Sequence, residues 1–448
     1  MTGSPPEAEA PEALPARLAR AALLVFVFLL PFMQPPVGVL GLPAVAADAA
    51  WLLLVPLWGL ALVTGAARLR WHKGLWLVAL YFAALAAATA ASDQPVRSAV
   101  KLATQVYLLS LPLIVLGLVR SERDMRAVFA AWLAASGIVA LVALAAVAAF
   151  YLAAGHPLLA WASNDYGTLA PGPYPRLRLT FQFAAMLCNY LTVSLMVLLV
   201  ARRLGWIGRT LFLLLLGGIL FAAAFSLTPG LGGIFLAGGV WLWLALEGRR
   251  PAAARLALAA GVGAAALFVV AMAVTPILHP TAPFLIRVPA TDLTLAPAVR
   301  LMTWMDAARN VTADPLLGRG LGVDVVDVDF LTPSGDLAHL SDAHNTFLNI
   351  AVQCGVFGLA AMVALLLWVG RRLRPFRLSA DAAGVLRIGL GLAFLDAFAY
   401  QGLGGSFEDA RHLWLLFGLI LAADRLGDAQ KERAAPAGTA PPEQVDRA

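Results

Sequence analysis

Long runs of apolar residues, separated by short polar connections, dominate the chain. Each run is near the roughly 20 residues that a helix needs to cross about 30 Å of hydrocarbon. The pattern predicts about 12 transmembrane helices and no alternating barrel strands, hence an all-α integral membrane protein. The approximate limits of the predicted spans are 18–34, 44–64, 74–91, 101–119, 127–153, 179–200, 209–226, 231–247, 255–275, 346–369, 384–400 and 412–424.

The polar stretches divide the chain into segments. Two connections are too long to be simple turns, and loops of such length usually carry function or are disordered. The second connection contains a helical pattern from Ala298 to Val311, so we expect it to be an ordered subdomain. The predicted segments are a disordered tail (1–16), nine helices (17–275) that include the first long connection (about 154–178), a large outer loop (276–345), three helices (346–424) and a second disordered tail (425–448).

Composition supports a membrane location. The chain is 61% hydrophobic and only 13% charged, with a mean hydropathy of +0.82, whereas a soluble domain carries about a quarter charged residues. The formal charge of +6 is spread over arginines between the spans, which argues against a nucleic-acid-binding face. Cys188 and Cys354 lie in apolar helical context without metal-ligand spacing, so we interpret them as packing residues.

Basic residues gather on alternate connections. Clusters of this kind flank the spans at Arg68–Lys73, Arg120–Arg126, Arg202–Arg209, Arg249–Arg255 and Arg371–Arg377. The positive-inside rule then predicts that both termini are cytoplasmic and that both long connections face outward. The outer face lacks ATP and nucleotide sugars, so chemistry there needs a substrate that is already activated and held in the membrane.

A polar segment, Ser341-Asp342-Ala343-His344-Asn345, stands directly before an outer span end. Ser341 or Asp342 is the expected N-cap of the following helix, which would place His344 in its first turn. The positive end of the helix dipole disfavours imidazolium there, and a neutral imidazole is what a general base needs. The alternative is a polar residue at the membrane surface. His339, in the preceding loop, is a second candidate.

Arginines on the outer face run against the charge bias, and three of them are candidate ligands for a substrate. Arg176 and Arg178 precede the span that begins near 179, and Arg300 lies on the loop helix with Trp304 one turn later on the same face. Guanidinium groups offer planar donor forks that suit phosphate oxygens. Snorkelling to lipid headgroups or pairing with aspartates is the alternative.

Further polar residues lie near the last two spans. Glu408 belongs to the last outer turn, where it is a candidate positioning group, and a local pair with Arg411 is the alternative. Asp396 lies within a predicted span, where an unpaired acid costs about 2.5–3.5 kcal/mol on insertion scales. It therefore needs a partner or water.

The glycine-rich segment 315–322 superficially suggests a phosphate-binding loop. It lacks the Gly-Lys-Ser/Thr ending of a P-loop, so a tight turn that closes the loop helix is the better interpretation. The three aspartates that follow do not have calcium-loop spacing. We predict no metal site.

One motif links this segment to a known family. His344-Asn345, nine residues and then Gly355-Val356-Phe357-Gly358 resemble the HN-x9-GxxG pattern of bacterial O-antigen ligases. Arg300, Trp304 and the Pro-Leu-Leu-Gly-Arg-Gly segment resemble an element of the wider O-antigen ligase/polymerase superfamily, and Arg178-Leu179-Thr180-Phe181 resembles its arginine-rich segment before the middle spans. Leu179 and Gln182-Phe183-Ala184 depart from the family pattern, which leaves open whether Arg176 or Arg178 is the matching residue.

The resemblance implies an O-antigen ligase, a membrane glycosyltransferase with a glycosyltransferase C-like fold. It would act at the periplasmic face of the bacterial inner membrane without metal, cofactor, nucleotide or nucleic acid. The donor would be a glycan on undecaprenyl diphosphate, and the acceptor a sugar hydroxyl of lipid A-core. The implied roles are general base for His344, diphosphate binding for Arg178, Arg176 and Arg300, and positioning for Asp342, Asn345, Trp304 and Glu408.

Other functions stay open on the sequence. An O-antigen polymerase would use the same donor and extend a second lipid-linked glycan. A protein O-oligosaccharyltransferase would glycosylate Ser or Thr. A lipid-linked sugar transporter would place charges near the bilayer midplane, often in paired repeats; here the polar groups gather at one face, which favours a surface enzyme.

Overall fold

The computed structural model describes residues 13–39, 42–153, 155–166, 174–245, 299–331, 337–374, 377–378 and 381–434, with shorter pieces at 252, 256, 259–263, 267, 286–287 and 294–295. Most of the predicted span 255–275, and most of both predicted tails, lie outside these residues. The described part is mostly α-helical, and its strands form two-stranded antiparallel hairpins.

Apart from α6 and α11, which lie in the two long connections, the helices overlap the apolar runs of the sequence. In chain order they are α1 (Leu14–Leu29), α2 (Ala46–Val63), α3 (Leu75–Ala90), α4 (Pro95–Leu118), α5 (Glu122–Leu152), α6 (Leu159–Ala162), α7 (Ala184–Arg203), α8 (Arg209–Ala224), α9 (Leu231–Ala245), α11 (Val299–Ala313), α12 (Thr346–Arg372), α13 (Ala382–Phe394) and α14 (Arg411–Ala434). A π-helix (Leu395–Tyr400) and a 3-10 turn (Gln401–Leu403) continue α13.

The strands belong to the connections between helices. They pair as β1 with β2 (Val37–Val39, Leu42–Ala44), β3 with β4 (Ser163–Tyr166, Tyr174–Leu177), β5 with β6 (Ile286–Arg287, Thr294–Leu295) and β7 with β8 (Val328–Leu331, Leu337–Leu340). The long connections predicted at 154–178 and 276–345 therefore contain ordered structure, and α11 matches the helical pattern expected there.

Six helical segments within the described residues are long and apolar enough to cross a membrane, which identifies a helical membrane protein. They are α2, α4, α5, α7, α12 and the segment Ala382–Leu403. Three further apolar helices, α3, α8 and α9, are shorter. The total of 12 spans stays a prediction.

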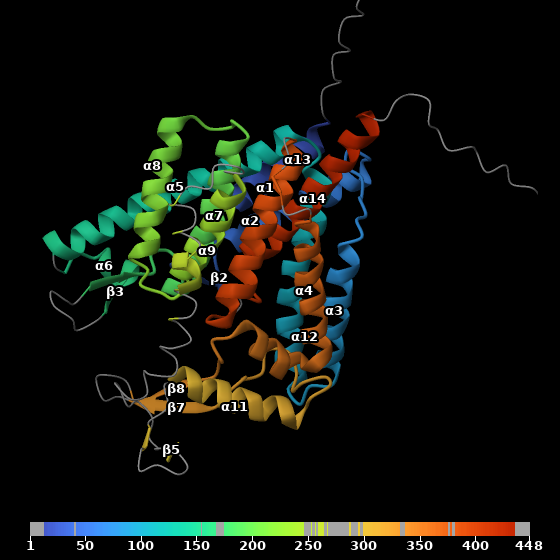
Figure 1. Cartoon of the computed structure of the whole chain (residues 1–448). Coiled ribbons are helices and arrows are strands. Elements are labelled where there is room, and N and C mark those ends of the chain that lie inside the picture. Colours follow the sequence, from blue (N-terminus) through green and yellow to red (C-terminus); the bar gives the residue numbers. More distant parts are fainter. Residues whose placement is uncertain are drawn as a thin grey trace, which may run out of the picture.

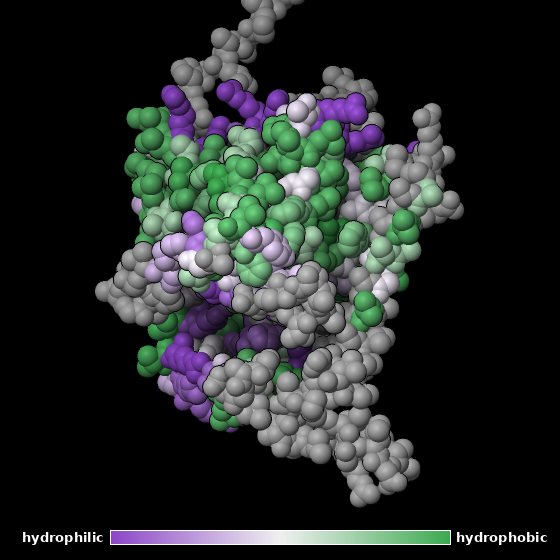
Figure 2. All heavy atoms as spheres, turned by 90° about the vertical axis from the view of Figure 1, so that its left-hand side faces the viewer, coloured by the Kyte–Doolittle hydropathy of each residue, from purple (hydrophilic) through white to green (hydrophobic). Residues whose placement is uncertain are grey.

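The two ends of the bundle differ in character (Figure 1). One end, here called the basic end, carries the arginine-rich connections α2–α3, α4–α5, α7–α8 and α12–α13, together with the end of α14. The opposite end, the loop end, carries α11 and the β7–β8 hairpin. Figure 2 shows a hydrophobic band between hydrophilic residues at the basic end and a hollow with hydrophilic walls toward the loop end.

Helix α7 forms the centre of the bundle. In its membrane-length window 89% of the residues are buried, the largest share among the six segments. Trp132 of α5 stacks on Tyr190 of α7 with ring centroids 5.5 Å apart, and its indole N–H donates to Ser194 Oγ at 2.9 Å. A polar indole inside a membrane protein needs such a partner.

The ends of the chain are more helical than the sequence suggested. Helix α1 begins at Leu14, within the segment predicted to be a disordered tail. Helix α14 continues to Ala434, past the predicted boundary at 424. Its last part is polar, which is why hydropathy alone ended the helix too early.

Candidate functional site

Asn345 begins α12, and this corrects the expected N-cap. Its side-chain Oδ1 accepts from the backbone N–H of Phe347 at 3.0 Å and of Leu348 at 3.2 Å. Ser341 and Asp342 therefore do not cap the helix, and His344 precedes the first turn instead of lying in it. The amide of Asn345 also donates to the Leu403 carbonyl at 3.2 Å, which fixes the start of α12 against the turn before α14.

His344 is held beside Asp342 by an unusual backbone conformation. Its φ is +49°, in the left-handed region that non-glycine residues seldom occupy. The His344 N–H donates to Asp342 Oδ1 at 2.6 Å, and the ring Nδ1 lies 3.3 Å from the same oxygen. The carboxylate favours a proton on Nδ1, which leaves Nε2 as the basic nitrogen. The imidazole is about half exposed, so a substrate can reach it.

Asn349 connects Asp342 to Glu408. Its amide nitrogen donates to Asp342 Oδ2 at 2.9 Å and to Glu408 Oε1 at 2.8 Å, and its oxygen accepts from Ala343 N–H at 3.2 Å. Ser406 Oγ adds a hydrogen bond of 2.6 Å to Asp342 Oδ1. Asp342 is therefore fixed from three directions, and its orientation fixes that of His344.

The pKa values of Asp342 and Glu408 are shifted in opposite directions. Burial raises the pKa of Asp342, but hydrogen bonds from His344 and Ser406 outweigh it and lower the pKa to about 2. Burial, with the nearby charges of Asp409 and Asp342, raises the pKa of Glu408 to about 8. Glu408 Oε2 is sealed from solvent without a partner among the described residues. At neutral pH the pair is one carboxylate and one neutral acid.

Helix α11 packs its polar face on the segment that carries His344. Trp304 donates its indole N–H to the Ala343 carbonyl at 3.1 Å, and Thr303 Oγ1 donates to the same carbonyl at 3.3 Å. Arg300, one turn earlier, donates to the Gly404 carbonyl at 2.5 Å. Arg300 and Trp304 thus share one helix face, as predicted, and this face borders the His344 segment.

The structure separates Arg176 from Arg178. Arg176 lies in strand β4, and its Nε donates to the Ser226 carbonyl after α8 at 3.4 Å. Arg178 lies just past the strand and donates to the carbonyls of Trp161 at 3.0 Å and Ala160 at 3.2 Å. Arg178 therefore stabilises the short helix α6, while Arg176 lines a cavity together with Arg300.

Arg176 and Arg300 line one cavity of about 360 Å³, here called the arginine cavity. Asn345 and Trp304 also line it, with residues from the turns after α8 and before α14. The lining among the described residues contains no carboxylate. Two guanidinium groups that are far apart in sequence thus meet in one pocket beside the His344 segment, a suitable environment for a polyanion.

A second, larger cavity of about 720 Å³ lies beside the same segment and is here called the polar cavity. Asp342 and Glu408 line it together with ion pairs. Lys101 binds Asp409, Arg97 lies 2.7 Å from Asp324, and Arg411 lies 2.7 Å from Asp48. Its walls mix cations with carboxylates, so this cavity suits a ligand rich in hydroxyl groups better than a phosphate.

The helix break in α12 explains the glycine-rich segment. Gly355 has φ +62° and ψ −164°, which interrupts α12, and the Val356 N–H donates outward to the Pro315 carbonyl at 2.8 Å. Arg319 N–H and Gly320 N–H donate to the carbonyls of Val352 and Gln353 that the break exposes, at 2.9 and 3.1 Å. The segment is therefore a turn docked on the broken helix, in agreement with its interpretation as a tight turn.

Several other candidates have partners elsewhere. Arg411 makes a two-pronged contact with Asp48 of α2 at 2.9 and 3.0 Å, so the expected local pair with Glu408 is wrong. His339 lies 3.1 Å from Asp329 within the β7–β8 hairpin. Asp396 of the π-helix accepts from Gln401 of the following turn at 3.2 Å through Oδ2, while its Oδ1 is buried without a partner among the described residues.

Asn349 and Ser406 were not predicted from the sequence. Asn349 stands one helical turn after Asn345 on the same face of α12, a spacing that could have suggested a shared role. Ser406 stands two residues before Glu408 in the last outer turn. Its contact with Asp342 joins segments 64 positions apart, and hydropathy patterns carry no signal for such a contact.

Comparison of the chain with protein-family models and with curated proteins finds no match.

Proposed function

We propose that the protein is a membrane glycosyltransferase of the O-antigen ligase type. It would transfer a glycan from undecaprenyl diphosphate to a sugar hydroxyl of lipid A-core at the periplasmic face of the inner membrane. The observation that carries the proposal is that Arg176 and Arg300 line one cavity and Asp342 lines another, both beside the segment that holds the Asp342–His344 pair at one end of a helical membrane bundle. The motif resemblance of the sequence points the same way.

The two cavities suit the two substrates. The donor brings a diphosphate, which the paired guanidinium groups of the arginine cavity can bind through their donor forks. The acceptor brings sugar hydroxyls, which the mixed polar walls of the other cavity can bind without an excess of positive charge. The His344 segment lies between them, since Asp342 lines the polar cavity and Asn345 the arginine cavity.

These positions support an inverting transfer with His344 as the base. The acceptor hydroxyl oxygen attacks the anomeric carbon, and the bond from that carbon to the diphosphate oxygen breaks with its electron pair. His344 Nε2 takes the hydroxyl proton, and Asp342 stabilises the imidazolium that forms. Arg176 and Arg300 stabilise the charge that develops on the departing undecaprenyl diphosphate. Attack from the face opposite the leaving group inverts the anomeric centre.

The test is transfer by the purified full-length protein. The reaction contains undecaprenyl-diphosphate glycan and lipid A-core with EDTA and no nucleotide. We expect glycan-bearing lipid A-core from the wild type and from His339→Ala, which changes an exposed hairpin histidine, and none from His344→Ala. Growth of the lipid-linked glycan alone would assign the protein as a polymerase. Neither product from a folded sample would refute a glycosyltransferase and favour a lipid-linked sugar transporter.

A further inference from the structure

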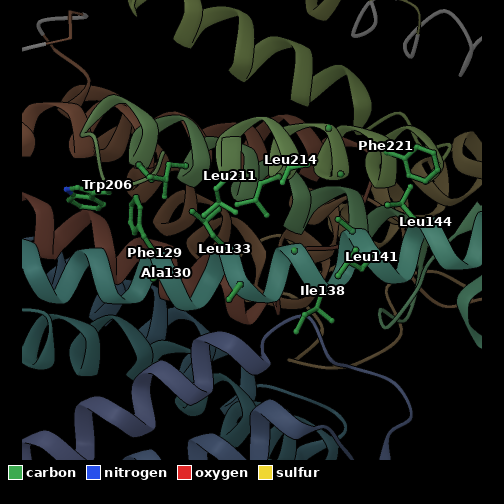
Figure 3. Close-up of a pocket in the computed structure, with 18 of the residues that line it drawn as sticks. Phe129, Ala130, Leu133, Ile138, Leu141, Leu144, Trp206, Leu211, Leu214 and Phe221 are labelled. Carbon is green, nitrogen blue, oxygen red and sulfur yellow. The ribbon is translucent and has the colours of Figure 1, made fainter. Parts of the chain in front are cut away.

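A large apolar hollow lies away from both cavities, between α5 and α8. It has a volume of about 910 Å³ and is here called the α5–α8 groove. Figure 3 shows Phe129 and Trp206 at one end, Leu144 and Phe221 at the other, and Leu133, Leu211 and Leu214 between the two helices.

Small residues create the hollow. The two helices approach closely at Gly218, where an added Cβ would come within 2.7 Å of the Ala140 Cβ. Gly217, the adjacent residue, faces open space, with nothing within 4 Å of an added Cβ. The two helices are therefore in contact at Gly218 and separated at Gly217, and the groove between them is open to the bilayer.

One end of the groove is strongly basic. Arg126 lines it and donates to the Trp206 carbonyl at 3.4 Å, and Arg202 donates to the carbonyl of Ile207, another lining residue, at 3.4 Å. Arg123, Arg203 and Arg209 are exposed on the same helix ends. Glu122 is the exposed acid among them, and it accepts from the Trp206 indole at 3.2 Å. Positive charge thus exceeds negative charge at this end.

The length of the groove limits its occupant. Along α8 it runs from Leu211 to Phe221, about 15 Å at 1.5 Å per residue. This is about half of the roughly 30 Å hydrocarbon core, hence the depth of one leaflet. An acyl chain whose headgroup lies at the basic end would reach the far end of the groove, while a chain that spans both leaflets would be too long for it.

We propose that the α5–α8 groove binds an anionic phospholipid from the leaflet at the basic end. The acyl chains fill the groove, and the phosphate lies among Arg126 and the neighbouring arginines, in the way that basic pockets between transmembrane helices hold acidic headgroups. Trp206 marks the interface between chain and headgroup, where indole rings are enriched. This lipid site is separate from the proposed glycosyl transfer and does not depend on it.

The test counts lipids on the purified full-length protein by native mass spectrometry, with equal amounts of phosphatidylglycerol and phosphatidylcholine. We expect the wild type to retain phosphatidylglycerol about fivefold better, the effect of one arginine at an anionic headgroup. Arg126→Ala should bring the ratio toward one. Gly217→Leu adds a side chain to the groove at a position where the new Cβ meets nothing within 4 Å, and it should lose one bound lipid.

Matched variants control for general effects on the membrane surface. Arg68→Ala removes an exposed arginine of the α2–α3 connection, and Gly59→Leu adds a side chain to open space on α2. Both should behave as the wild type. Equal retention of the two lipids, or an unchanged lipid count in Gly217→Leu, would overturn the proposal. So would displacement of phosphatidylglycerol by equimolar undecaprenyl phosphate, or cross-linking of two copies through α8.

Discussion

His344 combines a strained backbone with a fixed ring environment. Its φ of +49° costs about 1–2 kcal/mol in a non-glycine residue, and such conformations gather at functional sites. Leu179 and Leu227 share this conformation, and they adjoin Arg178 and Ser226. All three lie in segments that border the arginine cavity. The strained backbone therefore occurs where it orients side chains of the site, and not in the helical core.

Substitutions of His344 and of Asp342 distinguish the role of the base from the role of the group that orients it. His344→Ala should abolish transfer, because the residue that takes the proton of the acceptor hydroxyl is removed. Asp342→Asn keeps the shape of the partner but not its charge, so transfer should fall by about 10²–10⁴-fold while folding is retained. Initial rates in proteoliposomes with equal protein content measure both. Wild-type rates in His344→Ala would exclude this residue as the base.

Arg176 and Arg178 give opposite predictions, although the sequence did not distinguish them. Arg176→Lys should lower transfer at least about tenfold, since an ammonium group cannot reproduce the two-pronged contact with a diphosphate. Arg178→Lys should change it little, because Arg178 donates to backbone carbonyls of α6. Rates at saturating acceptor compare the two. The reverse order would place the donor diphosphate near α6.

Glu408 should make stability depend on pH. Its pKa is about 8 in the folded protein and 4.5 in an ordinary glutamate. Between these values the folded state holds a proton that the unfolded state releases, so stability should fall as pH rises from about 4.5 to 8. Melting temperature against pH should show a flatter curve for Glu408→Gln. Glu432→Gln, an exposed change at the end of α14, should keep the wild-type slope; equal slopes in all three would contradict a protonated Glu408.

At the scale of elements, the runs of apolar residues predicted where helices lie but not the residues at which they begin and end. The six described segments that can cross a membrane overlap predicted spans, because about 20 apolar residues have few other stable arrangements in a bilayer. Helix starts depend on single side chains, and Asn345 was as eligible a cap as Asp342. The placement of Arg176 and Arg178 depends on the β3–β4 hairpin and on the positive φ of Leu179, neither of which hydropathy reveals.

The break in α12 is one place where the outer loop docks on the membrane bundle. Gly355→Ala would bring a Cβ to 2.1 Å from the Leu316 carbonyl oxygen at a backbone angle unfavourable for alanine. We expect it to destabilise the protein by more than about 2 kcal/mol, because the turn would have to move away from the broken helix on which it docks. Gly370→Ala, on the same helix with open space around it, should unfold at the wild-type temperature. Equal melting of both variants would show that the turn does not constrain α12.

At the scale of the whole molecule, the site is assembled from both halves of the chain. Arg176 comes from a hairpin before α7, Arg300 from the outer loop, His344 from the start of α12, and Glu408 from the turn before α14. The sequence could nominate these residues because each is a polar group on a predicted outer connection. It could not show that Asn349 links two carboxyl groups, since that contact exists only after the helices pack.

The membrane orientation follows from the distribution of charge and can be tested on the intact chain. Positive residues border the connections at the basic end, so we expect that end to face the cytoplasm and the loop end to face the periplasm. Both native cysteines are buried, so an introduced cysteine can be labelled above a low background. Asp327→Cys, at a side chain that is 90% exposed near β7, should react with a membrane-impermeant maleimide in cells whose outer membrane alone is permeable. Glu432→Cys at the end of α14 should react only after the inner membrane is opened. The opposite pattern would place His344 on the side that holds nucleotide sugars, and a donor activated by undecaprenyl diphosphate would then no longer be required.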